Sequence, residues 1–132
     1  MTMSRKSKGI NAERDLIHKF WGIPGWAAVR VAGSGSMRYP SADVIATNRI
    51  RKLAIECKTS REPSRYIEKE EVKQLQEFAS YFNAEPWLGV KFDKSEWLFL
   101  AVPDIQPTDS AFVITQERAQ QKGLLFEELI RS

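Results

Sequence analysis

The chain has 132 residues, 42% of them hydrophobic and 28% charged, which is enough for one globular domain whose core needs no disulfide bonds. Cys57 is the only cysteine, so an internal disulfide is excluded and a reducing, intracellular environment is favoured. The basic N-terminus is followed by no apolar signal segment, and no stretch approaches the length of a membrane span. We therefore expect a cytoplasmic protein without a membrane partner.

The net charge of +3 is unevenly distributed along the chain. Residues 1–65 carry 13 Lys and Arg against 5 Asp and Glu, whereas residues 66–132 carry 7 against 12. This asymmetry predicts one basic face for a polyanion. A basic surface that is merely solvated explains the charge alone equally well.

The chain begins with a polar, basic stretch over residues 1–9, which we expect to form a flexible arm of a single domain covering residues 1–132. Residues 10–21 predict a helix, because their apolar side chains recur at the spacing of one buried stripe. This stripe consists of Leu16, Ile17, Phe20 and Trp21. Glycines and Pro24 end the helix.

A strand is predicted over residues 26–32, and the Gly-Ser-Gly-Ser segment at residues 33–36 predicts a loop. Two β-rich runs follow, over residues 42–46 and 53–58. A turn through Asn48 joins them, so a hairpin is the natural pairing.

The second half of the chain predicts a basic loop, an amphipathic helix, two apolar strands at hairpin spacing and a helical C-terminal segment. Their ranges are residues 61–65, 68–82, 86–92, 96–102 and 115–131. A connection rich in Pro and Asp occupies residues 103–110, and the last segment is interrupted near Gly123. The order of elements indicates an α/β domain with a central mixed sheet of about five strands flanked by helices.

The residues that could form a catalytic or metal-binding site are Asp43 and the Glu-Cys-Lys run at residues 56–58. Strand side chains alternate between faces, so Glu56 and Lys58 share one face while Cys57 points to the other and packs. The hairpin brings the start of one strand beside the end of its partner, and we therefore expect Asp43 and Glu56 to meet.

Two carboxylates at short range favour Mg²⁺, or Mn²⁺ in its place, because these ions also accept phosphate oxygens and water as ligands. Lys58 would then orient the attacking water or balance the charge of the transition state. The alternative is two surface carboxylates beside a chance lysine, since Asp followed by Glu-x-Lys is common in unrelated sequences.

Glu13 lies three and four residues before Leu16 and Ile17, hence beside the buried stripe. A carboxylate in this position would face the sheet and reach the metal site as a further ligand or through water. Its alternative is a glutamate in the first turn of a helix, favoured by the helix dipole.

Further basic and polar residues flank this constellation and are candidates for DNA contact. They lie in the N-terminal arm, around the Gly/Ser loop and just after Lys58. The set comprises Arg5, Lys6, Lys8, Arg30, Ser36, Arg38, Arg61, Arg65 and Tyr66. A plain flexible linker is the alternative for the Gly/Ser loop.

Taken together, these residues resemble archaeal-type Holliday junction resolvases, a branch of the PD-(D/E)xK nuclease superfamily. The resemblance covers most of the chain and depends on short segments in a specific order and spacing. These are Lys8-Gly9, Ala12-Glu13-Arg14, Ala28-Val29-Arg30, residues 33–36, Asp43-Val44-Ile45-Ala46, Ile55-Glu56-Cys57-Lys58, Tyr66-Ile67 and Glu77-Phe78-Ala79. Pro40 departs from the superfamily pattern, because it lies three residues before Asp43 rather than next to it.

The resemblance implies a restriction-endonuclease-like fold and a homodimer that binds four-way DNA junctions by shape and nicks two opposing strands with Mg²⁺. It assigns the family's essential helical acid to Glu13, its metal carboxylates to Asp43 and Glu56, and its lysine to Lys58. The family's functional loop serine falls on Ser34, with Ser36 as the alternative.

Two other functions stay open on the residues alone. One is a nuclease of the same superfamily that acts on linear duplex, and the other is a basic DNA-binding module without catalysis. No organic cofactor is expected in any of these cases. We predict that the apolar runs at residues 87–90 and 97–100 supply part of the dimer interface.

Overall fold

The computed structural model describes residues 5–33 and 38–132, with side chains from residue 8 onward. Its central sheet has six strands in the order β1-β2-β3-β5-β6-β9. They are β1 (Ala27–Arg30), β2 (Val44–Thr47), β3 (Lys52–Ser60), β5 (Glu85–Phe92), β6 (Trp97–Leu100) and β9 (Leu124–Leu125). Strands β3 and β5 run parallel and the other neighbouring pairs run antiparallel, so the predicted mixed sheet is confirmed.

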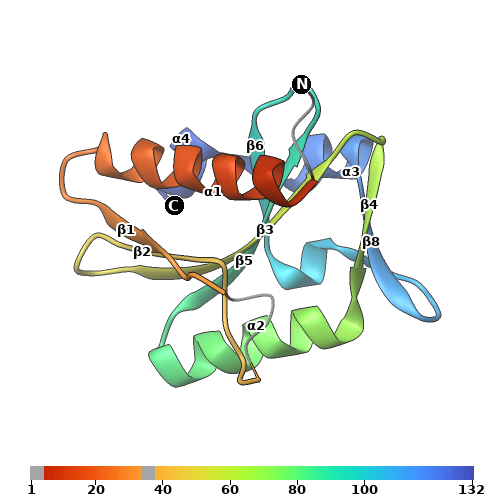
Figure 1. Ribbon diagram of the computed structural model, residues 1–132, viewed down its shortest axis with the longest axis horizontal. Helices are drawn as coiled ribbons and strands as arrows, with labels where there is room; N and C mark the ends of the chain where they lie inside the picture. The colour runs from red at the N-terminus through yellow and green to blue at the C-terminus, as the bar shows by residue number, and fades with distance from the viewer. Residues whose placement is uncertain (1–4, 34–37) are drawn as a thin grey trace.

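Helices cover both faces of this sheet, with α1 (Arg5–Trp21) and α2 (Lys69–Phe82) on opposite sides (Figure 1). The α1 face also holds α4 (Phe126–Leu129), and its core contains Leu16 and Phe20. The α2 face packs a second core around Leu75. Short helices α3 (Gln116–Lys122) and η2 (Val102–Asp104) lie in the C-terminal third.

A second, three-stranded sheet stands beside the first and is antiparallel throughout. Its strands are β4 (Ser64–Glu68), β8 (Ala111–Thr115) and β7 (Gln106–Pro107). Strand β4 follows β3 after only three residues and leads into α2, so this small sheet is held next to the end of β3 (Figure 1).

Strand β3 is central because its first half is apolar on both faces. Leu53, Ala54 and Ile55 are fully buried, and such a continuous apolar run is typical of a strand covered by helices on both sides. The second half, residues 56–60, is polar and half-buried. The strand therefore carries its polar side chains out of the core, toward β4.

The β2–β3 hairpin is closed by a turn in which the Asn48 side chain accepts hydrogen bonds from the backbone N–H groups of Ile50 and Arg51. Its register pairs Val44 with Ile55, so the next pair along the ladder is Asp43 and Glu56. The predicted hairpin is confirmed, and with it the meeting of these two acids at one end.

Four predictions about the fold were wrong in part. Residues 5–9 are not an arm but the beginning of α1, because Arg and Lys are good helix formers and the packed helix that follows extends back through Gly9. The strand predicted over residues 26–32 is shorter, and only residues 61–63 of the predicted basic loop lie outside strands. The segment from residue 115 is not one helix, because Gly123 separates α3 from β9 and α4.

All five predicted strands lie in the central sheet, but the two-residue strand β9 and the second sheet were not predicted. The apolar runs at residues 87–90 and 97–100 form β5 and β6 in the interior of the central sheet. All four residues of β6 are buried, as are the last three of residues 87–90. Their apolar side chains build the core of this chain and are not free to form a dimer interface.

No helix among the described residues is long and apolar enough to cross a membrane.

Candidate active site

Strand alternation places Glu56 and Lys58 on the α2 face of the sheet. Ala54 belongs to the core on that face, whereas Ile55 and Cys57 pack with the core beneath α1. Glu56 and Lys58 have the parity of Ala54, and Lys58 indeed contacts a side chain of α2. The predicted orientation of all these side chains is confirmed.

Asp43 is held in place by three hydrogen bonds at the end of the hairpin. Its backbone N–H donates to Ile55 O at 3.0 Å, and its carbonyl accepts from Val31 N at 2.8 Å. The backbone N–H of Cys57 donates to Asp43 Oδ2 at 2.8 Å. With only 9% of the residue exposed, Asp43 is the one buried charged residue in the part of the chain that the structure describes.

The two carboxylates are close enough to share a proton. Burial, followed by the charge of Asp43, raises the pKa of Glu56 from 4.5 to about 8; the charge of Glu71 and a hydrogen bond with Asp43 add to this rise, and Lys58 opposes it. Near neutral pH the pair therefore holds a proton between two desolvated oxygens. A site of this kind stabilises a bound cation in place of the proton.

The donor set at Asp43 and Glu56 fits a hard divalent ion. Mg²⁺ is commonly held by one or two carboxylates, with water and substrate phosphates completing its shell. Within residues 8–33 and 38–132, no group of three or more His, Cys, Asp or Glu side chains is arranged to hold an ion alone. The site thus offers two protein carboxylates and leaves the remaining positions to water and phosphate.

Lys58 forms ion pairs with two acids and a hydrogen bond with only one of them. Its Nζ donates to Glu71 Oε1 at 2.5 Å, whereas Glu56 Oε2 is 3.6 Å away, beyond hydrogen-bond distance. Burial alone would raise the pKa of Glu71, but the hydrogen bond and charge of Lys58, together with the backbone N–H of Glu68 and the charge of Arg65, outweigh burial and lower it. Glu71 therefore stays charged beside the lysine.

Glu13 approaches the same place from α1. Burial raises its pKa, the nearby charge of Asp43 adds to this, and Arg30 and Lys58 oppose it. Its Oε1 accepts a hydrogen bond from Arg30 Nε at 3.0 Å. The position beside the buried stripe is thus confirmed, and a direct bond from Glu13 to a metal ion stays a prediction.

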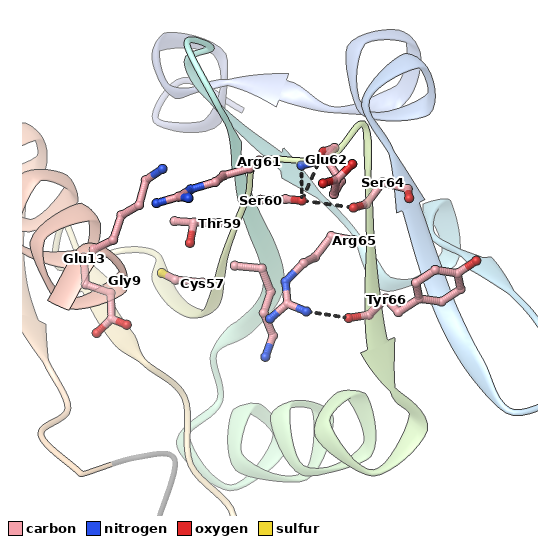
Figure 2. Close-up of a pocket in the computed structure, with 12 residues that line it drawn as sticks. Gly9, Glu13, Cys57, Thr59, Ser60, Arg61, Glu62, Ser64, Arg65 and Tyr66 are labelled. Carbon is pink, nitrogen blue, oxygen red and sulfur yellow. Dashed lines mark hydrogen bonds between the residues drawn. The ribbon is translucent and has the colours of Figure 1, made fainter. Parts of the chain in front are cut away.

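A cleft of about 590 Å³ opens next to these residues, between α1, the polar end of β3, and β4 (Figure 2). Among its lining residues are four cations: Lys8, Lys58, Arg61 and Arg65. Lys58 and Glu13 line the cleft, whereas Asp43 and Glu56 do not. The carboxylate pair is therefore adjacent to the cleft, with Lys58 connecting the two.

The remaining predicted DNA contacts divide into three groups. Arg38 is exposed, and Arg61 and Arg65 line the cleft, as contact with a phosphate requires. The ring of Tyr66 projects from β4 on the side opposite Arg65 (Figure 2). The side chains of Arg5 and Lys6, together with Ser34 and Ser36, lie outside the described residues.

Two predicted contacts already have partners within the protein. Arg30 is bonded to Glu13, and Lys8 Nζ lies 3.4 Å from Asp93 Oδ1. Arg30 is largely buried in this ion pair, so its first role is to compensate the charge of Glu13. Lys8 is more exposed, and a surface pair of this length leaves its ammonium free to exchange partners.

Sequence reasoning missed Glu71. One signal for it was present, because Glu71 lies three residues after Glu68 at the start of a helix, the spacing of a capping box. Glu71 Oε2 accepts a hydrogen bond from Glu68 N at 3.0 Å. Its contact with Lys58 depends on the packing of α2 against β3, which no local pattern predicts.

Comparisons with known proteins show the family of the chain. The family model described as archaeal Holliday junction resolvase (Hjc) matches residues 4–132. The crossover junction endodeoxyribonuclease Hjc of Archaeoglobus fulgidus is 38% identical, covering 93% of this chain and 95% of its own. The enzyme of the same name from Methanocaldococcus jannaschii is 33% identical over 93% of this chain and 86% of its own.

The solved structures give the same result. That of Archaeoglobus fulgidus Hjc, described as a Holliday junction resolvase from an archaeal hyperthermophile, matches with a TM-score of 0.85 and 36% identity. The match covers 92% of this chain and 97% of that one.

Proposed function

The chain belongs to the archaeal Holliday junction resolvase family, and we propose that it cuts four-way DNA junctions with a divalent metal ion held by Asp43 and Glu56. The observation that carries the metal site is the close pair of acids, Asp43 buried and Glu56 half-buried, in which desolvation first and the charge of Asp43 second raise the pKa of Glu56 to about 8. Such a pair is costly in a core and is relieved by a cation.

When bound, Mg²⁺ supplies a Lewis acid for the scissile phosphate and lowers the pKa of a water ligand. The side chains of the protein do the positioning. Lys58, at the border between carboxylates and cleft, places a positive charge where the attacking water and the phosphate oxygens meet. Glu13 adds a carboxylate within electrostatic reach of Asp43 and acts on the same water directly or through hydrogen bonds.

DNA backbone binding is the role we assign to the cleft. Arg61 and Arg65 lie on its β4 side, and Lys8 lies on the α1 side. The guanidinium of Arg65 is oriented by a hydrogen bond from its Nη1 to Tyr66 O at 3.2 Å, and Arg65 lines the cleft. Cations on both sides of a groove fit a nucleic-acid backbone without base readout, as recognition of junction shape requires.

A homodimer is the second part of the proposal, because two symmetric cuts call for two sites related by a two-fold axis. With β5 and β6 buried, the surface that fits a partner copy is the C-terminal end of α2. Tyr81 is 81% exposed and Phe82 is 53% exposed, and Phe82 stacks on Phe78 with ring centroids 4.5 Å apart. Aromatic residues exposed together in this way are typical of interfaces.

Cleavage of a four-way junction and of a linear duplex with the same arm sequences tests the proposal. We expect paired nicks in the junction with Mg²⁺ or Mn²⁺, none with EDTA, and little cutting of the duplex. In Asp43→Asn, cleavage is lost while junction binding persists. Equal cutting of both substrates would instead indicate a duplex nuclease, and binding without metal-dependent cutting would indicate a non-catalytic module.

A further inference from the structure

Glu71 is an acid for which the proposed reaction has no role so far, although it touches the proposed catalytic lysine. It lies in the first turn of α2, one residue after the exposed Glu70. One of its oxygens accepts from Lys58 Nζ at 2.5 Å and the other accepts from Glu68 N at 3.0 Å. Both oxygens are thus fixed, one by the helix backbone and the other by the lysine.

The position of the Lys58 ammonium depends on whether it is hydrogen-bonded to Glu56 or to Glu71. A lysine side chain has four rotatable bonds and loses much conformational freedom when its ammonium is fixed. Glu56 precedes Lys58 by two residues on the same strand face, so in the absence of Glu71 the ammonium has this carboxylate as its nearest acceptor. In the structure, Glu71 holds Nζ instead, and Nζ stays 3.6 Å from Glu56 Oε2.

This arrangement has a consequence for the metal site. A lysine bonded to Glu56 would occupy a lone pair that a divalent ion needs and would compete with that ion. A lysine bonded to Glu71 leaves the oxygens of Glu56 to the pair with Asp43, while the ammonium remains on the cleft side. Glu71 is itself fixed by a hydrogen bond to the backbone of α2. Through Glu71, the ammonium of Lys58 is therefore held in place by a rigid helix.

We propose that Glu71 is a positioning residue for Lys58: it holds the ammonium beside the cleft and out of hydrogen-bond distance from the Glu56 carboxylate, with which the ammonium keeps an ion pair. The catalytic role of Lys58 in this inference rests on the proposed function. The hydrogen bond between Lys58 and Glu71 is seen in the structure and does not depend on that function. Glu71 is not itself a lining residue of the cleft, and its direct contact with the site is the hydrogen bond to Lys58, besides a weaker electrostatic effect on Glu56.

Glu71→Gln separates this role from the structural role of Glu71. A glutamine still accepts the hydrogen bond from Glu68 N, because capping boxes use Glu and Gln alike, but it loses the charge that holds Lys58. Glu70→Gln is the matched control, since it removes one negative charge from the same turn and leaves Lys58 untouched. Single-turnover cleavage of a saturating four-way junction measures the chemical step, and binding to the same junction in Ca²⁺ measures affinity.

We expect the single-turnover rate constant to fall roughly tenfold in Glu71→Gln, because the variant loses one charge-assisted hydrogen bond to Lys58. Its affinity for the junction should be unchanged. Glu70→Gln cuts at the wild-type rate. Equal rates for the two variants, a rise in the rate of Glu71→Gln, or a loss confined to affinity would overturn the proposal.

The ¹⁵N NMR signal of the Lys58 ammonium in metal-free, DNA-free protein gives a readout that does not depend on cleavage. An ammonium held by a carboxylate exchanges its protons slowly, so the signal is expected in the wild type and in Glu70→Gln and is lost in Glu71→Gln. A signal that persists unchanged in Glu71→Gln contradicts the pairing. A wild type that leaves junctions uncut refutes the proposed function, whereas a wild type that cuts no faster than Glu71→Gln refutes only the role of Glu71.

Discussion

Replacing Glu56 by glutamine should make the metal-free protein more stable at alkaline pH. The Glu56 carboxyl has a pKa of 4.5 in the unfolded chain and about 8 in the folded protein, because of burial first and of Asp43 second. The folded state therefore binds the proton more tightly than the unfolded state. The contribution of this group to the free energy of unfolding is fully present below pH 4.5 and is lost as the pH rises from 4.5 through 8.

The size of the effect follows from the pKa shift. At about 1.4 kcal/mol for each pKa unit, ionising Glu56 in the folded protein costs at most about 5 kcal/mol. Glutamine keeps a buried polar group, and the titration is shared with Asp43, so we expect a gain of about 1–3 kcal/mol above pH 8. At pH 4 the wild-type side chain is neutral as well, and the gain should vanish.

Urea unfolding in EDTA, followed by the fluorescence of the buried Trp26 and Trp97, measures this difference. Glu77→Gln, on the exposed side of α2, controls for the loss of one charge. A stability gain of equal size at pH 4 and pH 9, or a variant less stable than the wild type at pH 9, would refute the reasoning about the carboxylate pair.

Three further predictions concern the core, the cysteine and the cleft. Gly89→Ala should destabilise the protein by about 1–3 kcal/mol in urea unfolding, because a Cβ there would lie 3.1 Å from side-chain atoms of both Ile55 and Phe99. An unchanged unfolding midpoint would show that these neighbours shift to accept the methyl group without cost. Cys57 should react with iodoacetamide far more slowly than a free thiol at pH 8, since burial and the charge of Asp43 raise its pKa, and fast labelling of folded protein would contradict its placement. Arg61→Ala should reduce the slope of log affinity against log salt for junction binding by about 1, and an unchanged slope would exclude Arg61 from phosphate contact.

The parts of the fold that the sequence predicted are those with a local signal. The stripe of Leu16 and Phe20 marks α1, and the β-rich runs on either side of Asn48 mark the hairpin that brings Asp43 to Glu56. The alternation along β3 was enough to separate Lys58 from Cys57. The placement of Asp43, Glu56 and Lys58 was therefore predictable from periodicity and spacing, whereas their assignment to metal binding and catalysis came from the family resemblance.

The missed elements and contacts depend on tertiary structure. Strand β4 is a five-residue segment with two charged side chains, and it is stable only because β8, more than forty residues later, pairs with it. Arg30 was expected to contact DNA because it is basic, but its partner Glu13 lies on a different element. Glu71 contacts Lys58 for the same reason, through the packing of α2 on β3.

Metal binding by the DNA-free protein tests the central claim most directly. Calorimetric titration with Mn²⁺ near pH 7 should show binding to the wild type with release of a proton, because the ion displaces the proton that Glu56 holds beside Asp43. The same binding should be lost in Asp43→Asn and in Glu56→Gln and should persist in Glu77→Gln. Undiminished Mn²⁺ binding in both site variants would contradict a common ion held by the two carboxylates.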